Sequence, residues 1–216
     1  MNWLRKLRSL SKDFRRRRQA KRWEHKWDTV AHPFRWELEA EAPSIVRSVN
    51  DGWLTPGTTV LDIGCGLGYN AAWLVNHNFK VLGIDVSSAA IDKARCLHPE
   101  RDGLKFQQCD VTATEYNAEF SFDAIIDRGC LHGIPKPLWD SYVRNIALWL
   151  KPDGRMLLLM ALFETSKSEL TANMRNLFHP HFEIANVASI SLSKNKTKEP
   201  LPGLEFQLVK SHEASC

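Results

Sequence analysis

A carboxylate and three glycines stand close together in the segment V-L-D-I-G-C-G-L-G-Y-N, residues 60–70. Gly64, Gly66 and Gly68 allow a sharp backbone turn and a close approach of a ligand to the main chain, and the helix expected next offers unpaired N–H groups. The dinucleotide fingerprint G-x-G-x-x-G is absent, because the third residue after Gly66 is not glycine. Asp62 precedes the turn by two residues, and its charge would repel a pyrophosphate. The turn therefore suits a ligand that carries an ammonium or sulfonium group.

Three further acidic residues follow or end predicted strands. Asp85 comes 23 residues after Asp62, where a carboxylate can accept from both hydroxyls of a ribose. Asp110 is placed to accept from an adenine amino group while the N–H of Val111 donates to the ring. Asp127 ends the next strand. Because the carboxyl ends of parallel strands meet at one edge of a sheet, we expect these four acidic residues to converge on one crevice.

Each carboxylate also has a structural alternative. Asp62 and Asp85 could cap the helices that follow them, and Asp110 could be an ordinary turn residue. Asp127 could hold Arg128 or a loop N–H.

The segment after the fourth acidic residue, D-R-G-C-L-H, brings Arg128, Cys130 and His132 to the same edge. Cys130 is interpreted as a small buried residue, because no base lies beside it in the sequence. His132 could act as a general base or orient the substrate, or it could be a packed, hydrogen-bonded histidine. Three aromatic residues near the N-terminus could form a pocket wall or pack against a helix: Trp27, Phe34 and Trp36.

These residues need a scaffold of alternating strands and helices. Apolar runs predict strands at 59–63, 80–85, 105–109, 122–127 and 155–161, separated by helical stretches at 71–76, 88–96 and 136–150. The last third reads as two strands, 182–192 and 204–210, joined by a polar loop. The sequence predicts an α/β fold with a doubly wound, mostly parallel, seven-stranded Rossmann-like sheet and a C-terminal antiparallel hairpin.

Length and composition narrow the class of protein. The chain has 216 residues with 44% hydrophobic residues, enough for one domain with a sizeable core. Its five cysteines form no C-x-x-C pair or cluster with metal spacing, so we expect neither a disulfide framework nor a metal site. The longest apolar run, 156–163, is far shorter than the roughly 20 residues of a membrane-spanning helix. We expect a cytoplasmic protein without a transmembrane segment.

A basic arm precedes this domain. Residues 1–26 contain eleven Lys or Arg and two acidic residues, a net charge of +9. Because the whole chain has a net charge of +4, the remaining residues carry a net charge of −5. Trp3, Leu7, Leu10 and Phe14 fall on one face of a predicted helix. That stripe could pack on the domain, or the helix could bind an anionic membrane surface or a nucleic acid. We divide the chain into an arm, 1–36, and a domain, 37–216.

The glycine turn with Asp62, the acidic residues Asp85 and Asp110, the segment 127–132 and L-K-P-D-G-R at 150–155 resemble the motif series of class I S-adenosylmethionine-dependent methyltransferases. D-R-G-C-L-H-G-I, together with W-D-T-V-A-H-P-F-R-W upstream, is similar to bacterial small-molecule methyltransferases of the thiopurine and heterocycle type. This chain departs from that group in having Phe34 where a Trp is usual, and in its longer arm.

The resemblance implies a site for S-adenosyl-L-methionine and a small-molecule acceptor, with no metal. The residues it assigns to the cofactor are Asp62, Gly64, Cys65, Gly66, Gly68, Asp85, Val86, Asp110, Val111 and Asp127. Those it assigns to the acceptor are Trp27, Phe34, Trp36, Arg128 and His132, with His132 as the candidate catalytic residue.

The expected reaction is a displacement at the methyl carbon of a sulfonium, for which the protein aligns the nucleophile and excludes water. A thiolate or ring nitrogen needs no strong base, whereas a hydroxyl would, and His132 is the candidate base. We therefore favour a soft or heterocyclic nucleophile. Two alternatives remain: an RNA or protein methyltransferase that docks through the basic arm, and a cofactor-binding adaptor without catalysis.

Overall fold

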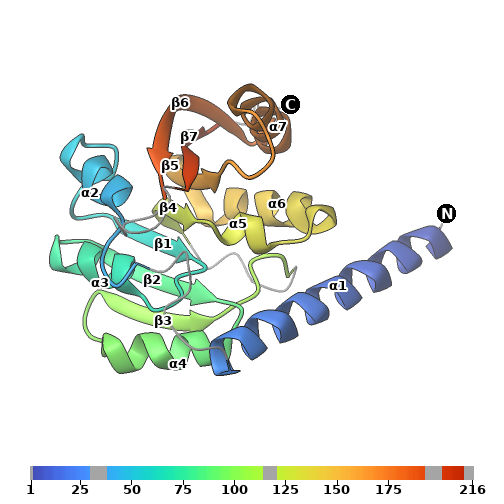
Figure 1. Ribbon diagram of the computed structural model, residues 1–216, viewed down its shortest axis with the longest axis horizontal. Coiled ribbons are helices and arrows are strands. Elements are labelled where there is room, and N and C mark those ends of the chain that lie inside the picture. The colour runs from blue at the N-terminus through green and yellow to red at the C-terminus, as the bar shows by residue number, and fades with distance from the viewer. Residues whose placement is uncertain (1, 30–37, 114–120, 193–200, 212–216) are drawn as a thin grey trace.

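The computed structural model describes residues 2–29, 38–113, 121–192 and 201–211, with side chains from Leu10 onward. Its centre is a seven-stranded sheet of order β3-β2-β1-β4-β5-β7-β6, in which β7 runs in the opposite direction to all the other strands (Figure 1). This confirms the predicted fold class and its C-terminal hairpin. The strands are β1 (Thr59–Ile63), β2 (Lys80–Asp85), β3 (Leu104–Gln108), β4 (Phe122–Arg128), β5 (Leu150–Ala161), β6 (Phe182–Ser191) and β7 (Pro202–Lys210).

Helices cover both faces of the sheet, and each face has its own apolar core. One core packs side chains of α2, α3 and α4 against the sheet, and the other packs α5, α6 and α7 against the opposite face. Because both faces are covered, the central strands are nearly apolar on both faces, as their composition predicted, apart from acidic residues such as Asp62 and Asp127 near their carboxyl ends. The helices are α1 (Asn2–Thr29), α2 (Pro43–Asn50), α3 (Tyr69–Asn76), α4 (Ser88–Leu97), α5 (Cys130–Gly133), the 3₁₀ turn η1 (Lys136–Leu138), α6 (Trp139–Trp149) and α7 (Lys167–Phe178).

Several predicted boundaries shift. The stretch expected to be one helix over 136–150 is η1 followed by α6, which ends at Trp149 because Leu150 already pairs with Phe122 as the start of β5. Three helices, α2, α5 and α7, were not predicted. The last of them shows a recognisable start signal, because the Ser166 side chain accepts from the Glu169 N–H.

The strand register brings the ends of β1, β2 and β4 level. Ile63 pairs with Ile84 on one side and with Asp127 on the other, and Asp85 pairs with Gln108 of β3. The loops that leave these strands therefore start at the same edge of the sheet, where the sequence places the acidic residues.

Helix α1 crosses this edge and then projects away from the domain, so that the N-terminus is a far point of the molecule (Figure 1). The expectation that its apolar stripe packs on the domain is wrong for the two members whose side chains are described, because Leu10 is 58% and Phe14 is 67% exposed. Among the side chains of α1 that the structure describes, the buried ones are instead Gln19 and Trp27. At 3.6 residues per turn the stripe and this buried face lie roughly 160° apart, so both cannot contact the domain.

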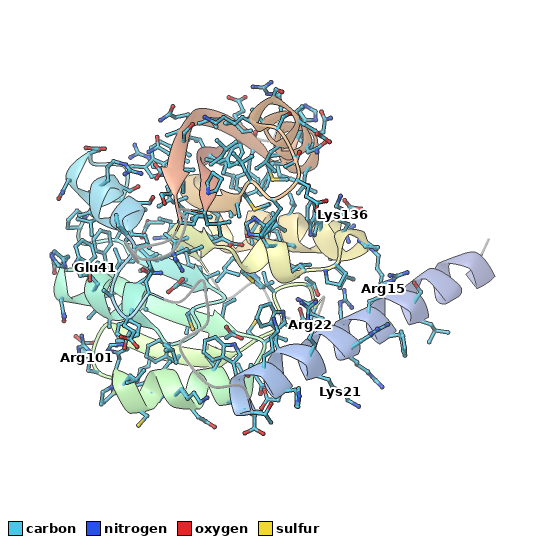
Figure 2. All side chains as sticks on the ribbon, viewed as in Figure 1. Arg15, Lys21, Arg22, Glu41, Arg101 and Lys136 are labelled. Atoms are coloured by element: carbon cyan, nitrogen blue, oxygen red, sulfur yellow. The ribbon has the colours of Figure 1, made fainter. Side chains whose placement is uncertain are left out.

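Lys21 shares the outward face with the stripe and points away from the sheet (Figure 2). Trp3 and Leu7 of the stripe lie outside the described side chains. No described helix is both long and apolar enough to cross a bilayer.

Candidate functional site

A cavity lies at the carboxyl edge of β1, β2, β3 and β4, with α1 forming its remaining wall. The cavity wall brings together most of the residues predicted for the site: Trp27, Asp62, Gly64, Cys65, Gly66, Gly68, Asp85, Val86, Asp110, Val111 and Arg128. Asp127 and His132 do not line it, and Phe34 and Trp36 lie outside the described residues.

Asp62 is the most deeply buried acid of this wall, at 1% exposure, and its Oδ2 has no hydrogen-bond partner in the described structure. Burial raises the pKa of Asp62 to about 7, with further contributions from the neighbouring carboxylates Asp127 and Asp85. Asp62 does not cap α3, whose N-cap is Gly68 without a side-chain bond. A buried carboxylate without a partner suits a cationic group of a ligand.

Asp85 holds the glycine turn while facing the cavity. Its Oδ2 accepts from Gly66 N at 3.2 Å, and its Oδ1 accepts from Ser87 N at 3.0 Å. Burial raises the pKa of Asp85 to about 6. The cap of α4 is Ser87, whose Oγ accepts from Ala90 N, so Asp85 is not the helix cap that the structural alternative supposed.

Asp110 is fixed by the residue two positions later. Its Oδ1 accepts from Thr112 N at 2.9 Å and from Thr112 Oγ1 at 2.7 Å. This local turn is the geometry of the structural alternative, yet Asp110 also lines the cavity. The turn therefore orients a carboxylate that still faces the ligand space.

Asp127 is fully buried, and both of its oxygens are bonded within the protein. Oδ1 accepts from Cys130 N at 2.7 Å, and Oδ2 accepts from Leu131 N at 3.1 Å and from Tyr142 OH at 2.6 Å. These bonds fix the start of α5. The contacts correspond to the structural alternative for this residue, in which Asp127 holds loop N–H groups.

His132 faces β5 rather than the cavity. Its Nε2 accepts a hydrogen bond from Ala161 N at 2.7 Å, and its ring lies edge-on to Phe163 with centroids 5.3 Å apart. Burial lowers the pKa of His132. Protonation at Nε2 would break the bond to Ala161, so this geometry matches the packed, hydrogen-bonded alternative.

The glycine turn leaves no room for side chains. Gly64, Gly66 and Gly68 all have positive φ, at 66°, 52° and 77°. A Cβ on Gly66 would lie 3.1 Å from the Trp27 ring, and a Cβ on Gly64 would lie 2.6 Å from the Cβ of Cys130. The turn therefore requires glycine both for its backbone angles and for its close neighbours.

The wall formed by α1 was only partly predicted, because Gln19 and Trp23 were missed beside Trp27. Their four-residue spacing places all three on one face of a helix, which is the signal that could have found them. Contacts near the C-terminal end of the helix secure it: the Ser88 hydroxyl donates to Glu24 Oε1 at 2.7 Å, and Lys93 Nζ donates to the carbonyl of Trp27.

The donors and acceptors of this wall fit S-adenosylmethionine. The unpartnered Asp62 oxygen could face the ligand's positive charge, and Asp85, Asp110 and Val111 line the same cavity at the next two strand ends. No cluster of residues able to hold a metal occurs within the described ranges.

The sequence model described as thiopurine S-methyltransferase (TPMT) matches residues 18–207. The chain belongs to the thiopurine S-methyltransferase family. It is an S-adenosylmethionine-dependent methyltransferase, as the motif series implied. The match begins within α1, so the residues of α1 that line the cavity fall inside the matched region.

Relatives of this methyltransferase share its fold. An uncharacterized methyltransferase of Schizosaccharomyces pombe is 35% identical over 111 residues, covering 50% of this chain and 74% of that protein. A structure described as the conversion of a disulfide bond into a thioacetal group during echinomycin biosynthesis has a TM-score of 0.76 at 18% identity, covering 91% of this chain and 94% of the other. The Burkholderia thailandensis 1,6-didemethyltoxoflavin N1-methyltransferase, with S-adenosylhomocysteine bound, has a TM-score of 0.62 at 21% identity, covering 79% and 78%.

Proposed function

We propose that this methyltransferase transfers a methyl group to a thiol or ring nitrogen of a small molecule. Asp62, Asp85, Asp110 and the glycine turn would hold S-adenosylmethionine. The cofactor supplies an electrophilic methyl group on a sulfonium, which leaves as a neutral thioether. The protein contributes alignment of the acceptor and exclusion of water.

The observation that carries this proposal is the kind of side chain in the cavity wall. Among the described residues that line it, none is a histidine or lysine that could deprotonate a hydroxyl, and the three carboxylates of the wall are the ones proposed to hold the cofactor. Burial, followed by nearby carboxylates, raises the pKa of the Cys65 and Cys130 thiols well above their usual range, so neither is a ready base. An acceptor that is already nucleophilic at neutral pH needs no such group.

Arg128 supports an acceptor with anionic character. It lines the cavity, donates from Nη2 to the carbonyl of Leu192 at 3.2 Å, and lies near enough to Asp62 to offset part of the rise in that group's pKa. A guanidinium in a largely buried wall can stabilise a thiolate or a deprotonated heterocycle beside the sulfonium.

The test is a panel of acceptors. Formation of S-adenosylhomocysteine is followed with aryl thiols, imidazoles and phenols of graded pKa, and in parallel with labelled cofactor and small-molecule, RNA and protein fractions of a cell extract. Turnover of thiols or ring nitrogens, with label in the small-molecule fraction, is expected. Turnover restricted to phenols, or label confined to RNA or protein, contradicts the proposal.

A variant of His132 distinguishes general-base catalysis from a mechanism in which the protein only aligns the reactants. Because the residue faces Ala161 and not the cavity, we expect the variant His132→Gln to change kcat by less than about threefold with a thiol acceptor. A general base would contribute about 10²–10⁴. A limb of the pH–rate profile that stays fixed when the acceptor changes, and vanishes in the variant, would contradict this expectation.

For the outward face of α1 we propose an anionic lipid surface as the partner. Leu10 and Phe14 are exposed on the same face as the exposed cations Arg17 and Lys21. Large apolar side chains among cations fit a membrane interface, where they insert below the headgroups. A nucleic-acid backbone would require the cations alone.

Vesicle sedimentation tests this partner. We expect binding to phosphatidylcholine vesicles with 30 mol% phosphatidylglycerol and loss of that binding in Leu10→Ser/Phe14→Ser. The matched control is Leu97→Ser/Leu148→Ser, which removes two exposed apolar residues from other helices and leaves binding intact. Equal binding by both double variants, or a preference for a single-stranded RNA, overturns the proposal.

A further inference from the structure

Gln19 carries a buried polar group with no partner. The side chain is 9% exposed, its Oε1 has no hydrogen-bond partner in the described structure, and it lines the cavity. A buried acceptor without a donor destabilises a protein by roughly 1–3 kcal/mol. Because the residue lines the cavity, a bound ligand is the natural source of the missing donor.

Neighbouring contacts fix which end of the cavity Gln19 faces. One turn earlier in α1, Arg16 donates from Nη2 to the Thr112 carbonyl at 2.5 Å and from Nε to Thr112 Oγ1 at 3.3 Å. Thr112 in turn donates to Asp110 Oδ1 from both N and Oγ1. The turn of α1 that carries Gln19 is therefore tied to the loop that carries Asp110.

The two polar groups considered at this end of the cavity are both hydrogen-bond acceptors. Asp110 offers a carboxylate, and Gln19 offers an amide oxygen. Both are acceptors, so a ligand group placed between them must supply two donors. A primary amino group on an aromatic ring has two N–H bonds in the ring plane, which point in different directions. The 6-amino group of adenine has this arrangement.

We propose that Gln19 Oε1 accepts a hydrogen bond from the 6-amino group of the bound S-adenosyl ligand, while Asp110 accepts the other N–H. This rests on the proposed placement of the cofactor. Gln19 then makes recognition of adenine depend on α1, because the first acceptor comes from a strand end and the second comes from the helix.

Calorimetric titration of the full chain tests the contact with two ligands. One is S-adenosylhomocysteine, and the other is its 6-desamino analogue, in which hydrogen replaces the amino group. In Gln19→Met, which keeps the length of the side chain and removes the acceptor, we expect about 5–30-fold weaker binding of S-adenosylhomocysteine. Binding of the desamino analogue should change by less than twofold.

Two further variants keep the test specific. Gln19→Glu retains an acceptor and should retain the preference for the amino ligand, even if Gln19→Met folds poorly. Arg18→Met places the same new side chain at an exposed position of α1 and should change neither affinity.

Three outcomes overturn the inference. Equal weakening of both ligands by Gln19→Met assigns Gln19 to the packing of α1. Unchanged affinities with a raised KM for the acceptor assign it to the acceptor site, and unchanged affinities and KM exclude a ligand contact. If wild-type protein binds neither ligand, the placement of the cofactor itself fails, which is a separate and recognisable result.

Discussion

The two walls of the cavity are built in different ways. The strand-end wall carries Asp62 and Asp85 on β1 and β2, whose positions follow from the parallel register of a buried sheet. The α1 wall carries Gln19 and Trp27 on a helix held to the domain by side-chain contacts, such as that of Arg16 with Thr112.

The difference is one of local stability. Strands in the middle of a sheet open only when much of the domain unfolds, whereas a helix secured by a few side chains can detach alone. We therefore expect changes in the strand-end wall to weaken binding at equilibrium by about tenfold or more, and changes in the α1 contacts to alter mainly the rates of binding and release.

The largest effect is expected where the two walls touch. In Gly66→Val the new side chain would meet the Trp27 ring at a backbone position with positive φ. Both walls would be displaced, and calorimetry should show at least about 10²-fold weaker binding of S-adenosylhomocysteine, with the circular dichroism spectrum retained.

Gly57→Val is the matched control for Gly66→Val. Gly57 also has positive φ, but a Cβ there meets nothing within 4 Å. It should lower the melting temperature and leave binding intact. Retained binding in Gly66→Val would mean that the glycine turn is not part of the ligand site.

A smaller loss is expected when one acceptor leaves the strand-end wall. Asp85→Ala removes the acceptor proposed for the ribose diol, and a charge-assisted bond contributes roughly 1.5–3 kcal/mol, or about 10–100-fold in the dissociation constant. Asp92→Ala, which removes a largely exposed carboxylate on α4, should leave the constant unchanged. Equal constants for both variants and the wild-type protein would remove Asp85 from the site.

Protonation of Asp62 probes the same wall without changing its shape. Since the pKa of Asp62 is raised to about 7, a cationic ligand should bind about tenfold more weakly at pH 5.5 than at pH 7.5, and Asp62→Asn should flatten this dependence.

In the ligand-free protein, protonation of Asp62 has the opposite effect: it raises folding stability, whereas it weakens binding of a cationic ligand. A raised folded-state pKa means that the stability contributed by the neutral form is present at low pH and is lost as pH rises toward 7. Ligand-free Asp62→Asn should therefore unfold at a higher temperature than wild-type protein at pH 8, with a smaller gain at pH 5 and none below the usual carboxyl pKa of 3.8. A gain that is the same at both pH values would show that Asp62 does not titrate in this range.

The smallest equilibrium effect is expected from the α1 contacts. Arg16→Met and Glu24→Met each remove a contact between α1 and the domain, and stopped-flow measurements should show S-adenosylhomocysteine leaving about threefold faster, with a smaller change in affinity. Loss of binding as complete as in Gly66→Val would show that α1 is as firmly held as the strands, and the contrast between the walls would fail.

The residues of the strand-end wall could be predicted from the sequence because the features that place them are local. An apolar run, a terminal acidic residue and glycines at fixed spacing place Asp62, Asp85 and Asp110 at one edge of a parallel sheet. Gln19 and Trp23 were not predicted, because the face of α1 that packs on the domain is determined by contacts with residues far away in the sequence, such as Thr112 and Gly133.

Two other residues show the same limit. Asp127 lies near the end of β4 and His132 lies just after it in α5, but their side chains turn toward Tyr142 and Ala161, respectively. Sequence spacing brings a residue to an edge of the sheet, whereas the packing of neighbouring helices and strands decides which way its side chain points.

The contact between Arg16 and Thr112 also has a consequence for synthesis of the chain. The two residues are 96 positions apart, so α1 leaves the ribosome well before the loop that receives it. Until β3 and that loop have been made and folded, the buried face of α1, with Gln19 and Trp27, has nothing to cover it. Helix α1 is translated before the other described elements and is thus among the last to dock, so the ligand cavity closes only after much of the domain has formed.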